Sequence, residues 1–297
     1  MKILLTGASG FVGSFLRDRP GYSSLESNGE LVDLRDAEGL NSAIAGIKPD
    51  AVIHLAATSF VPASFARPQE TYDINFLGTF NLLTALRESG FTGRFLFVGS
   101  ADEYGKVSPD DLPIRESCPL KPRSPYGVSK VAAEALCYQW GQTEGFSTIM
   151  TRSFNHIGPG QSDQFAVSSF GKQIIEIKVG RREPVLRVGD LDATRDFTDV
   201  RDVARAYTAL LERGRSGETY NVCSGVERSL GSILARLIEL AGIDVNVERD
   251  LTRLRPAEQR RVCGNCEKLQ RDTDWKPEIS IDQSLQDILE DWKERLS

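Results

Sequence analysis

A tyrosine and a lysine stand four residues apart in the segment Tyr126-Gly127-Val128-Ser129-Lys130. On a helix, this spacing places both side chains on one face. A tyrosine with an ordinary pKa of roughly 10 is a poor base at neutral pH, but a nearby ammonium group favours its phenolate. In the reducing direction the same phenol gives its proton to a carbonyl oxygen as hydride reaches the carbon. The pair therefore indicates proton transfer, and a solvated pair on an amphipathic helix is the alternative.

A serine lies just beyond the apolar run at residues 95–98, which is typical of a buried strand. The hydroxyl of Ser100 can hydrogen-bond a carbonyl oxygen and stabilise the charge that develops on it. We therefore predict that Ser100, Tyr126 and Lys130 form one catalytic group.

A glycine-rich turn, Thr6-Gly7-Ala8-Ser9-Gly10-Phe11-Val12-Gly13, lies near the start of the chain. It follows a predicted strand at residues 2–6 and opens a predicted helix at residues 11–17, which is the context of a dinucleotide fingerprint. Its glycines let backbone amides approach a pyrophosphate, and the helix N-terminus adds a favourable potential. The spacing is Gly-x-x-Gly-x-x-Gly, and a merely tight connection is the alternative. We predict a nicotinamide dinucleotide, whose oxidised ring would further favour the phenolate of the catalytic tyrosine.

The adenosine end of such a cofactor is less clearly encoded. Asp33 lies where an acidic side chain can accept a hydrogen bond from the adenine amino group, and capping of the next helix is the alternative. The second strand normally carries the residue that separates NAD from NADP, but it is not evident between Gly21 and Glu30. The residues therefore leave the cofactor preference open.

The elements that must position these residues alternate between strand and helix. Further strand signals lie at residues 31–32, 51–55, 148–151 and 219–222, and the longest helical stretches run over 69–88 and 125–142. Strands separated by helices predict an α/β fold with a parallel sheet covered on both faces. We expect one unit at 1–157 plus about 198–224, and a smaller lobe at about 158–197 and 225–297, closed by a helix near 281–295. Both long helices are also candidates for a dimer face.

Composition restricts the class of protein. The net charge of −6 over 297 residues argues against a general nucleic-acid binder. No apolar run approaches the roughly 18 residues of a membrane span, and no leader pattern is evident, so we expect a cytoplasmic protein. The five cysteines fit a reducing compartment. Cys263 and Cys266 have metal-ligand spacing without a second pair, so we expect no metal site.

Taken together, these motifs resemble those of the extended short-chain dehydrogenases/reductases along the whole chain. The resemblance rests on the glycine turn, His54-Leu55-Ala56-Ala57, Asn75, Ser100, Tyr126 and Lys130. It implies a Rossmann-type doubly wound domain and a small C-terminal lobe that binds a nucleotide-sugar. His54 is expected to pack at a strand end beside the cofactor. The implied cofactor-binding residues are Gly7, Gly10, Phe11, Val12, Gly13, Asp33, Leu34, Leu55, Ala56, Ala57, Asn75, Tyr126, Lys130 and Phe154.

Longer strings narrow the resemblance to the reductases of GDP-linked 4-keto-6-deoxy sugars within this family. These strings are residues 152–161, 195–202, 220–225 and 254–256. They imply reduction of the C4 ketone of GDP-4-dehydro-6-deoxy-D-mannose to GDP-D-rhamnose, with NADPH as the first expectation and NADH as the second, in a homodimer. Arginine suits a sugar diphosphate because its planar fork holds phosphate oxygens at two points. The candidate substrate-binding residues are Ser100, Asp102, Glu103, Tyr126, Asn155, Lys172, Arg187, Arg195, Arg255 and Glu258. For Lys172 and Arg187, a surface salt bridge is the alternative.

Three other functions stay open. The dehydratases of GDP-mannose share parts of these strings, and they carry a glutamate two residues after the serine or threonine, where this chain has Asp102 followed by Glu103. Epimerases of the family are a further alternative. A non-catalytic dinucleotide sensor on the same fold is the alternative from another class, but such a protein would be expected to lose the tyrosine-lysine pair.

Overall fold

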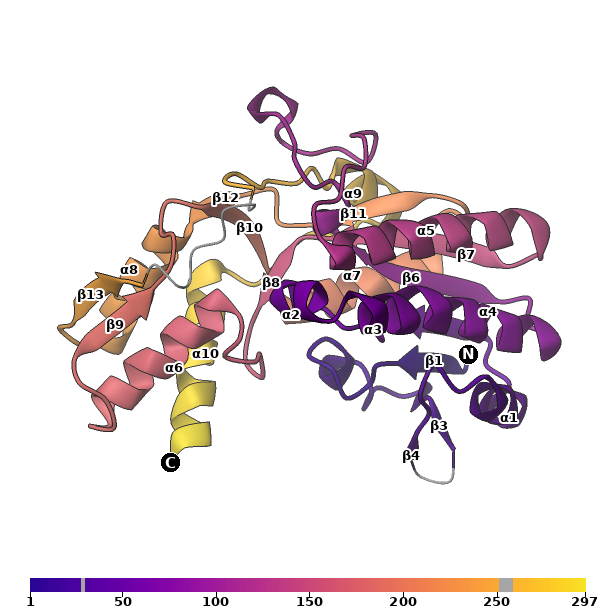
Figure 1. Cartoon of the computed structure of the whole chain (residues 1–297), viewed down its shortest axis with the longest axis horizontal. Helices are drawn as coiled ribbons and strands as arrows, with labels where there is room; N and C mark the ends of the chain where they lie inside the picture. Colours follow the sequence, from indigo (N-terminus) through magenta and orange to yellow (C-terminus); the bar gives the residue numbers. More distant parts are fainter. Residues whose placement is uncertain (28–29, 251–258) are drawn as a thin grey trace.

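The computed structural model describes residues 1–27, 30–250 and 259–297 of the chain. A six-stranded sheet in the order β11-β7-β6-β5-β1-β2 forms its larger part, and all neighbouring strands are parallel (Figure 1). Parallel strands need crossover connections, which the helices between them supply. The strands are β1 (Ile3–Thr6), β2 (Tyr22–Ser24), β5 (Ala51–His54), β6 (Arg94–Ser100), β7 (Ser147–Ser153) and β11 (Thr219–Val222).

Successive side chains of these strands face opposite layers, as the pleat of a strand requires. On β1, Leu4 packs with α1 (Ala37–Ile47), α4 (Gly78–Glu88) and α5 (Pro125–Thr143). Leu5 packs on the other face with η1 (Gly13–Phe15), α7 (Val200–Arg213) and α9 (Glu267–Thr273). Both faces are covered, so the predicted doubly wound α/β fold is confirmed.

A second hydrophobic core lies in the other half of the molecule, at the left of Figure 1. Three helices surround it: α6 (Ala166–Lys178), α8 (Leu230–Ala241) and α10 (Ile281–Leu296). They pack with a three-stranded sheet in the order β12-β10-β8 and a parallel pair, β13-β9. The strands are β8 (Asn155–Ile157), β9 (Val185–Val188), β10 (Thr194–Asp199), β12 (Glu227–Ser229) and β13 (Asn246–Arg249).

Two local expectations were wrong. The α-helix expected over 11–17 is only the 3₁₀ turn η1, and Pro20 then prevents helical conformation from continuing through Arg19. The second strand does exist, as β2, and pairs with β1 from Ile3–Tyr22 to Leu5–Ser24. It escaped detection because it is a three-residue, partly exposed edge strand without an apolar run. The signal at 31–32 belongs instead to a short hairpin of β3 (Glu26–Ser27) and β4 (Glu30–Leu31).

The long helix expected over 69–88 is interrupted in its middle. α3 (Pro68–Tyr72) and α4 are joined by η2 (Asp73–Leu77), a turn of π-helix. π-Helical turns are rare and often lie at functional sites. This one carries Asn75 and therefore sets the direction of a side chain implicated in cofactor binding. The expected helix over 125–142 forms as α5, with its first turn capped by the Ser124 hydroxyl, which accepts from the Gly127 amide.

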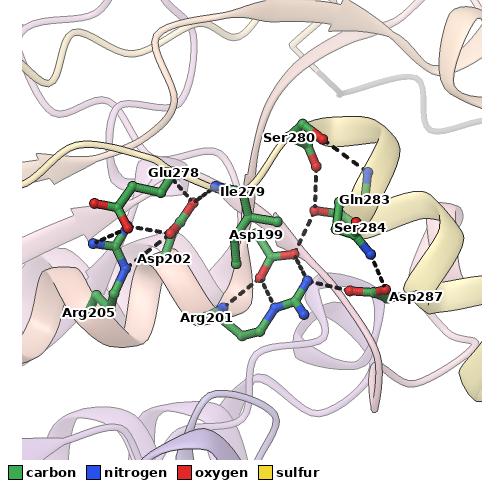
Figure 2. A network of polar contacts seen from close by, with 10 residues as sticks. All are labelled: Asp199, Arg201, Asp202, Arg205, Glu278, Ile279, Ser280, Gln283, Ser284 and Asp287. Carbon is green, nitrogen blue, oxygen red and sulfur yellow. Dashed lines mark hydrogen bonds and ion pairs between the residues drawn. The ribbon is translucent and has the colours of Figure 1, made fainter.

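A polar network joins the start of α7 to α10 (Figure 2). The Asp199 carboxylate accepts hydrogen bonds from the Arg201 guanidinium at 2.8 Å and from the Ser284 hydroxyl at 2.6 Å. Arg201 also lies 2.6 Å from Asp287 on α10. One turn later, Asp202 accepts the amides of residues 278 and 279, which lead into α10, at 2.9 Å each. These bonds hold β10, which ends at Asp199, against the second core.

Features that bear on location and redox state are few. In the described ranges, no helix is long and apolar enough to span a membrane. All five cysteines are free thiols. Across residues 1–27, 30–250 and 259–297, no cluster of three histidine, cysteine or acidic side chains is arranged to hold a metal ion.

Candidate active site

A cleft of about 1590 Å³ runs between the six-stranded sheet and the second core. Its wall combines the glycine turn after β1, the ends of β6 and β8, the start of α5, the N-terminal half of α6, and β10. Ligands of open α/β sheets bind at the carboxyl ends of parallel strands, which is where this cleft lies. The cleft is large enough for two extended ligands, since a pocket for one drug-sized molecule measures about 300–1,000 Å³.

The glycine turn forms one end of the cleft. Gly7 has a left-handed backbone (φ +70°), and a Cβ there would lie 2.8 Å from the Ala56 amide nitrogen. At Gly13 a Cβ would lie 2.3 Å from the Gly7 carbonyl oxygen. Both positions therefore require glycine, because the turn lies close to the loop after β5 at Gly7 and folds back on its own backbone at Gly13.

The amides after this turn suit an anion. Gly10 donates to the Gly7 carbonyl at 3.0 Å, which closes the turn. Within the described part of the chain, the amides of Phe11 and Val12 make no hydrogen bond to protein, and both residues line the cleft. Unpaired amides at the start of a helical turn attract phosphate oxygens. The residues of this turn therefore fit a dinucleotide pyrophosphate.

Ser100, Tyr126 and Lys130 come together on the cleft wall, as their sequence positions predicted. Ser100 is the last residue of β6, and Tyr126 lies in the first turn of α5. Lys130, one turn along α5, donates to the Val98 carbonyl oxygen at 2.8 Å. A strand end and the first turns of one helix thus converge on a single point.

Burial controls the protonation of this group. Burial is the main reason that the pKa of Tyr126 is well above its ordinary value, and the nearby charge of Asp102 acts in the same direction, while the polar side chain of Ser100 opposes them. The phenol therefore stays protonated at neutral pH. Burial lowers the pKa of Lys130 to about 8. Such perturbed groups in a cleft are typical of catalytic sites.

The cofactor-binding candidates divide into two sets. The cleft wall includes Gly7, Gly10, Phe11, Val12, Gly13, Leu55, Ala57, Tyr126, Lys130 and Phe154. Asp33, Leu34, Ala56 and Asn75 are not part of that wall. Leu34 is buried in the core beneath α1 and α4.

Asp33 has a different partner from either of those expected. Its carboxylate accepts from the Arg35 guanidinium, with a shortest distance of 2.5 Å, at the protein surface. It does not cap the next helix, because Asp36 does so by accepting the Gly39 amide at 3.0 Å. The capping alternative for Asp33 was therefore wrong.

The side chain of Asn75 is buried behind the cleft wall and bonds residues on either side of it. Its oxygen accepts the Thr58 amide at 2.8 Å, and its amide group donates to the Thr58 carbonyl and to the Ser129 hydroxyl, at 3.1 and 3.0 Å. All of these bonds are internal to the protein. Asn75 thus ties the loop after β5 to the helix that carries Tyr126 and Lys130.

His54 lies at the end of β5 and is fully buried. Its Nδ1 lies 2.7 Å from the Thr6 hydroxyl, and its Nε2 lies 2.9 Å from the Thr79 hydroxyl. The Thr6 oxygen also accepts the Ala56 amide at 3.1 Å. The imidazole therefore joins the strand before the glycine turn to the strand before residues 55–57, as expected of a packed residue beside the cofactor site.

The substrate-binding candidates also separate. The wall of the cleft includes Ser100, Asp102, Tyr126, Asn155, Lys172 and Arg195. Asn155 and Arg195 are on β8 and β10, which pair in parallel. Arg195 is 8% exposed, and its guanidinium donates to the Thr194 carbonyl at 2.6 Å. Two further candidates, Arg255 and Glu258, lie outside the described residues.

The surroundings of Glu103, Arg187 and Lys172 bear on their roles as substrate-binding candidates. Glu103 was expected to contact substrate, but it is completely buried and is not part of the cleft wall. Arg187 is exposed on β9 and is not among the residues that line the cleft, so its role in substrate binding stays a prediction. Lys172 lines the cleft but is paired with Asp163 at 2.7 Å, which agrees with the salt bridge considered for it.

Sequence reasoning missed several residues of the cleft. Three additional arginines, Arg123, Arg182 and Arg260, line it, and no local motif distinguishes them from surface arginines. Phe60 and Phe165 also line the cleft and meet edge to face at a centroid distance of 6.2 Å, one before α2 (Val61–Ala66) and the other before α6. Only the apposition of the two halves of the molecule brings these residues together.

Comparison with known proteins identifies the family and the relatives that this chain is similar to. The model of the family described as GDP-mannose 4,6 dehydratase matches residues 23–288. The GDP-6-deoxy-D-mannose reductase of Pseudomonas aeruginosa is 46% identical over 99% of this chain and 98% of its own. The GDP-mannose 4,6 dehydratase of Cricetulus griseus is 28% identical over 87% of this chain and 74% of its own.

A solved structure agrees with these sequence matches. The structure of RMD from Pseudomonas aeruginosa complexed with NADPH matches with a TM-score of 0.92 and 45% identity, over 99% of this chain and 100% of that one. The motifs and the family match cover the same elements. This chain therefore belongs to the GDP-mannose 4,6 dehydratase family, within the extended short-chain dehydrogenases/reductases that its motifs resemble.

Proposed function

We propose that this protein reduces the C4 ketone of GDP-4-dehydro-6-deoxy-D-mannose to GDP-D-rhamnose with NADPH, and that NADH is the weaker donor. The observation that carries the proposal is the 46% identity to GDP-6-deoxy-D-mannose reductase over nearly the full length of both chains. NADPH is preferred because the matching structure of RMD is a complex with it. The glycine turn and the Ser100-Tyr126-Lys130 group support reductase chemistry independently.

The cofactor would be held by residues at one end of the cleft. The amides of Phe11 and Val12 face no protein acceptor among the described residues, and they suit the pyrophosphate. Leu55, Ala57 and Phe154 supply apolar wall beside them. When bound, the reduced nicotinamide supplies the hydride for the ketone carbon.

The side chains of Tyr126, Ser100 and Lys130 would carry out the proton transfer. Burial keeps the Tyr126 phenol protonated at neutral pH, so it is available as the acid for the carbonyl oxygen. The Ser100 hydroxyl can turn to that oxygen as charge develops on it. The Lys130 ammonium, fixed by the Val98 carbonyl, stabilises the phenolate that remains.

The sugar nucleotide would occupy the rest of the cleft. Arg195 on β10 and Asn155 on β8 lie on neighbouring strands and line the cleft, where they can bind the diphosphate. Arg255 is a further candidate from its sequence position. The protein has a net charge of −6, so anion binding must depend on such local cations. The guanine base is inferred from the relatives alone.

A dehydratase is the second candidate, because the matching family is described by that activity. Removal of water across C5 and C6 requires an acid and a base beside the sugar. Of the acidic pair after Ser100, only Asp102 lines the cleft, and Glu103 is buried behind it. This arrangement favours reduction over dehydration.

The decisive experiment supplies GDP-4-dehydro-6-deoxy-D-mannose with NADPH or NADH, follows nicotinamide absorbance, and identifies the sugar formed. Reduction to GDP-D-rhamnose supports the proposal. The matched control is GDP-mannose without added cofactor. Formation of the keto sugar there, with no reduction in the first assay, would instead identify a dehydratase, and binding of NADPH without turnover would favour a sensor.

We also propose how the chain is divided and assembled. Residues 1–157 and about 198–224 would form the cofactor unit, and about 158–197 and 225–297 the sugar-nucleotide lobe, although α9 packs against α7 and β11 of the first unit. A homodimer would bury the exposed apolar side chains Leu77, Phe80, Val128 and Tyr138 of the η2, α4 and α5 region. Sedimentation of Phe80→Glu against the natural protein tests this interface. The cytoplasm is the expected compartment.

A further inference from the structure

Glu103 lies directly behind the catalytic serine and is fully buried, although it has no place in the reaction described above. It ends η3 (Ala101–Glu103), the single turn that follows β6. Its Oε1 accepts the Ser100 amide at 2.7 Å, and the Ser100 hydroxyl accepts the Asp102 amide at 3.2 Å. These reciprocal bonds form a capping box, so the carboxyl group of Glu103 fixes the backbone from which the Ser100 hydroxyl projects.

The other carboxyl oxygen lacks a donor. Glu103 Oε2 is buried and accepts no hydrogen bond from the described residues. Its nearest cation, Arg152, is 3.8 Å away through Nε. Arg152 instead donates hydrogen bonds from Nε and Nη2 to the carboxylate of Glu134, at 2.9 and 2.6 Å. An ionised carboxylate with one bare, buried oxygen is costly, so this oxygen is more stable when it carries a proton.

A proton on Oε2 has an acceptor within reach. Glu103 Oε2 and Glu134 Oε2 both lie near Arg152 Nε, at 3.8 and 2.9 Å, so the two carboxyl groups are neighbours. A hydrogen bond between two carboxyl groups requires that one of them carries a proton. Burial, followed by the charge of Glu134, raises the pKa of Glu103 well above its ordinary value. Arg152 and Glu134 form the bidentate ion pair, so a protonated Glu103 beside them would have a carboxylate to donate to.

The space around this carboxyl group leaves it no other position. A Cβ on Gly99 would lie 2.3 Å from Glu103 Oε1 and 2.3 Å from the Thr151 carbonyl oxygen. The backbone of β6 is therefore pressed against the carboxyl group. A negative charge here would also act on both Lys130 and Tyr126, whose pKa values would rise. A neutral group can hold Ser100 without opposing formation of the Tyr126 phenolate.

We propose that Glu103 is a positioning residue that works as a neutral carboxylic acid, accepting the Ser100 amide through Oε1 and donating its proton to Glu134 through Oε2, so that the Ser100 hydroxyl is held at Tyr126. The kinetic part of this inference rests on the proposed reductase function. The protonation of Glu103 does not.

Three substitutions test the positioning role in the NADPH-dependent assay. Glu103→Gln keeps one acceptor and one donor without charge, and it retains kcat within about threefold of the natural protein. Glu103→Leu removes the tether and lowers kcat about tenfold or more with little change in KM, since a small displacement of a reacting group is costly. In a Ser100→Ala background, Glu103→Leu lowers kcat less than about twofold further, because its effect passes through the serine.

Glu116→Leu is the matched control. Glu116 Oε1 likewise accepts a main-chain amide, that of Asn221 at 2.9 Å, but it does not contact Ser100. Glu116→Leu is expected to change kcat by the same factor whether position 100 is serine or alanine. The proposal is overturned if Glu103→Gln loses as much kcat as Glu103→Leu, or if Glu103→Leu costs the same factor in both backgrounds.

An infrared difference spectrum tests the proton without turnover. When the spectrum of Glu103→Gln is subtracted from that of the natural protein at neutral pH, the difference is expected to contain the C=O stretch of a protonated carboxylic acid. The corresponding difference for Glu116→Gln is expected to lack this band. A carboxylate band in place of the acid band would overturn the proposal even if Glu103→Leu does not fold. Absence of keto-sugar reduction by the natural protein would reject the proposed function and leave this spectral result standing.

Discussion

The buried imidazole of His54 makes the stability of this protein depend on pH in a defined window. The Thr79 hydroxyl donates to the Asn75 carbonyl at 2.7 Å, so it must accept from His54 Nε2–H. The Thr6 hydroxyl accepts the Ala56 amide and gives its own proton to Nδ1. Every donor and acceptor is satisfied when His54 is neutral with its proton on Nε2. A second ring proton, on Nδ1, would displace the Thr6 hydroxyl proton from this bond.

Burial is the main cause that lowers the pKa of His54 from 6.5 to about 3, and the charge of Lys130 adds to it. Between these two values the unfolded chain binds the proton and the folded protein does not. The free energy of unfolding therefore rises with pH through this window and is lost as pH falls below 6.5. Integration of the linkage relation gives a loss of about 2 kcal/mol between pH 7 and pH 5 from this group.

Urea unfolding at pH 5, 6 and 7 and constant ionic strength measures this loss. The natural protein is expected to lose about 2 kcal/mol more than His54→Gln between pH 7 and 5, whatever the difference between them at pH 7. The protein has only two histidines, and His156 stays in both proteins, so its contribution cancels. Equal losses in the two proteins would refute a neutral, buried imidazole at position 54.

The remaining predictions concern the active site. Tyr126→Phe lowers kcat about 10²- to 10⁴-fold, and NADPH affinity measured by nicotinamide fluorescence stays nearly unchanged; turnover like that of the natural protein would reject the phenol as the acid. Arg195→Ala raises KM for the sugar nucleotide about tenfold or more and KM for NADPH far less, and equal increases would indicate a structural role. Gly13→Ala abolishes NADPH binding, because its Cβ would lie 2.3 Å from the Gly7 carbonyl. Gly46→Ala in α1 is the control, since nothing lies within 4 Å of its Cβ; it retains binding and gains about 1 kcal/mol of stability by helix propensity.

The features that sequence alone predicted well have local or periodic signals. The glycine turn, the strand that ends at Ser100 and the helix that carries Tyr126 and Lys130 are each encoded within about twenty neighbouring residues. Parallel strands bring their carboxyl ends to one edge of a sheet. The motifs alone were therefore sufficient to predict the catalytic group and the phosphate turn, which the structure brings to one cleft.

The features that it predicted poorly depend on packing. β2 is an edge strand with only one strand neighbour, so it needs no apolar run. Asp102 and Glu103 are adjacent and chemically alike, but the turn after β6 points one into the cleft and buries the other. Asn75 was implicated by resemblance, and the π-helical turn directs its carboxamide toward Thr58 and Ser129 instead of into the cleft.

The sequence by itself determined the parallel α/β architecture, the glycine turn and the residues proposed for proton transfer, because these depend on spacing along single elements. The tertiary structure alone decided which charged side chains are available to a ligand. Burial in a medium of low polarity turns Glu103 and His54 into neutral internal partners, and the apposition of two cores brings Arg123, Arg182 and Arg260 to the cleft. Desolvation and long-range contact have no counterpart in residue spacing.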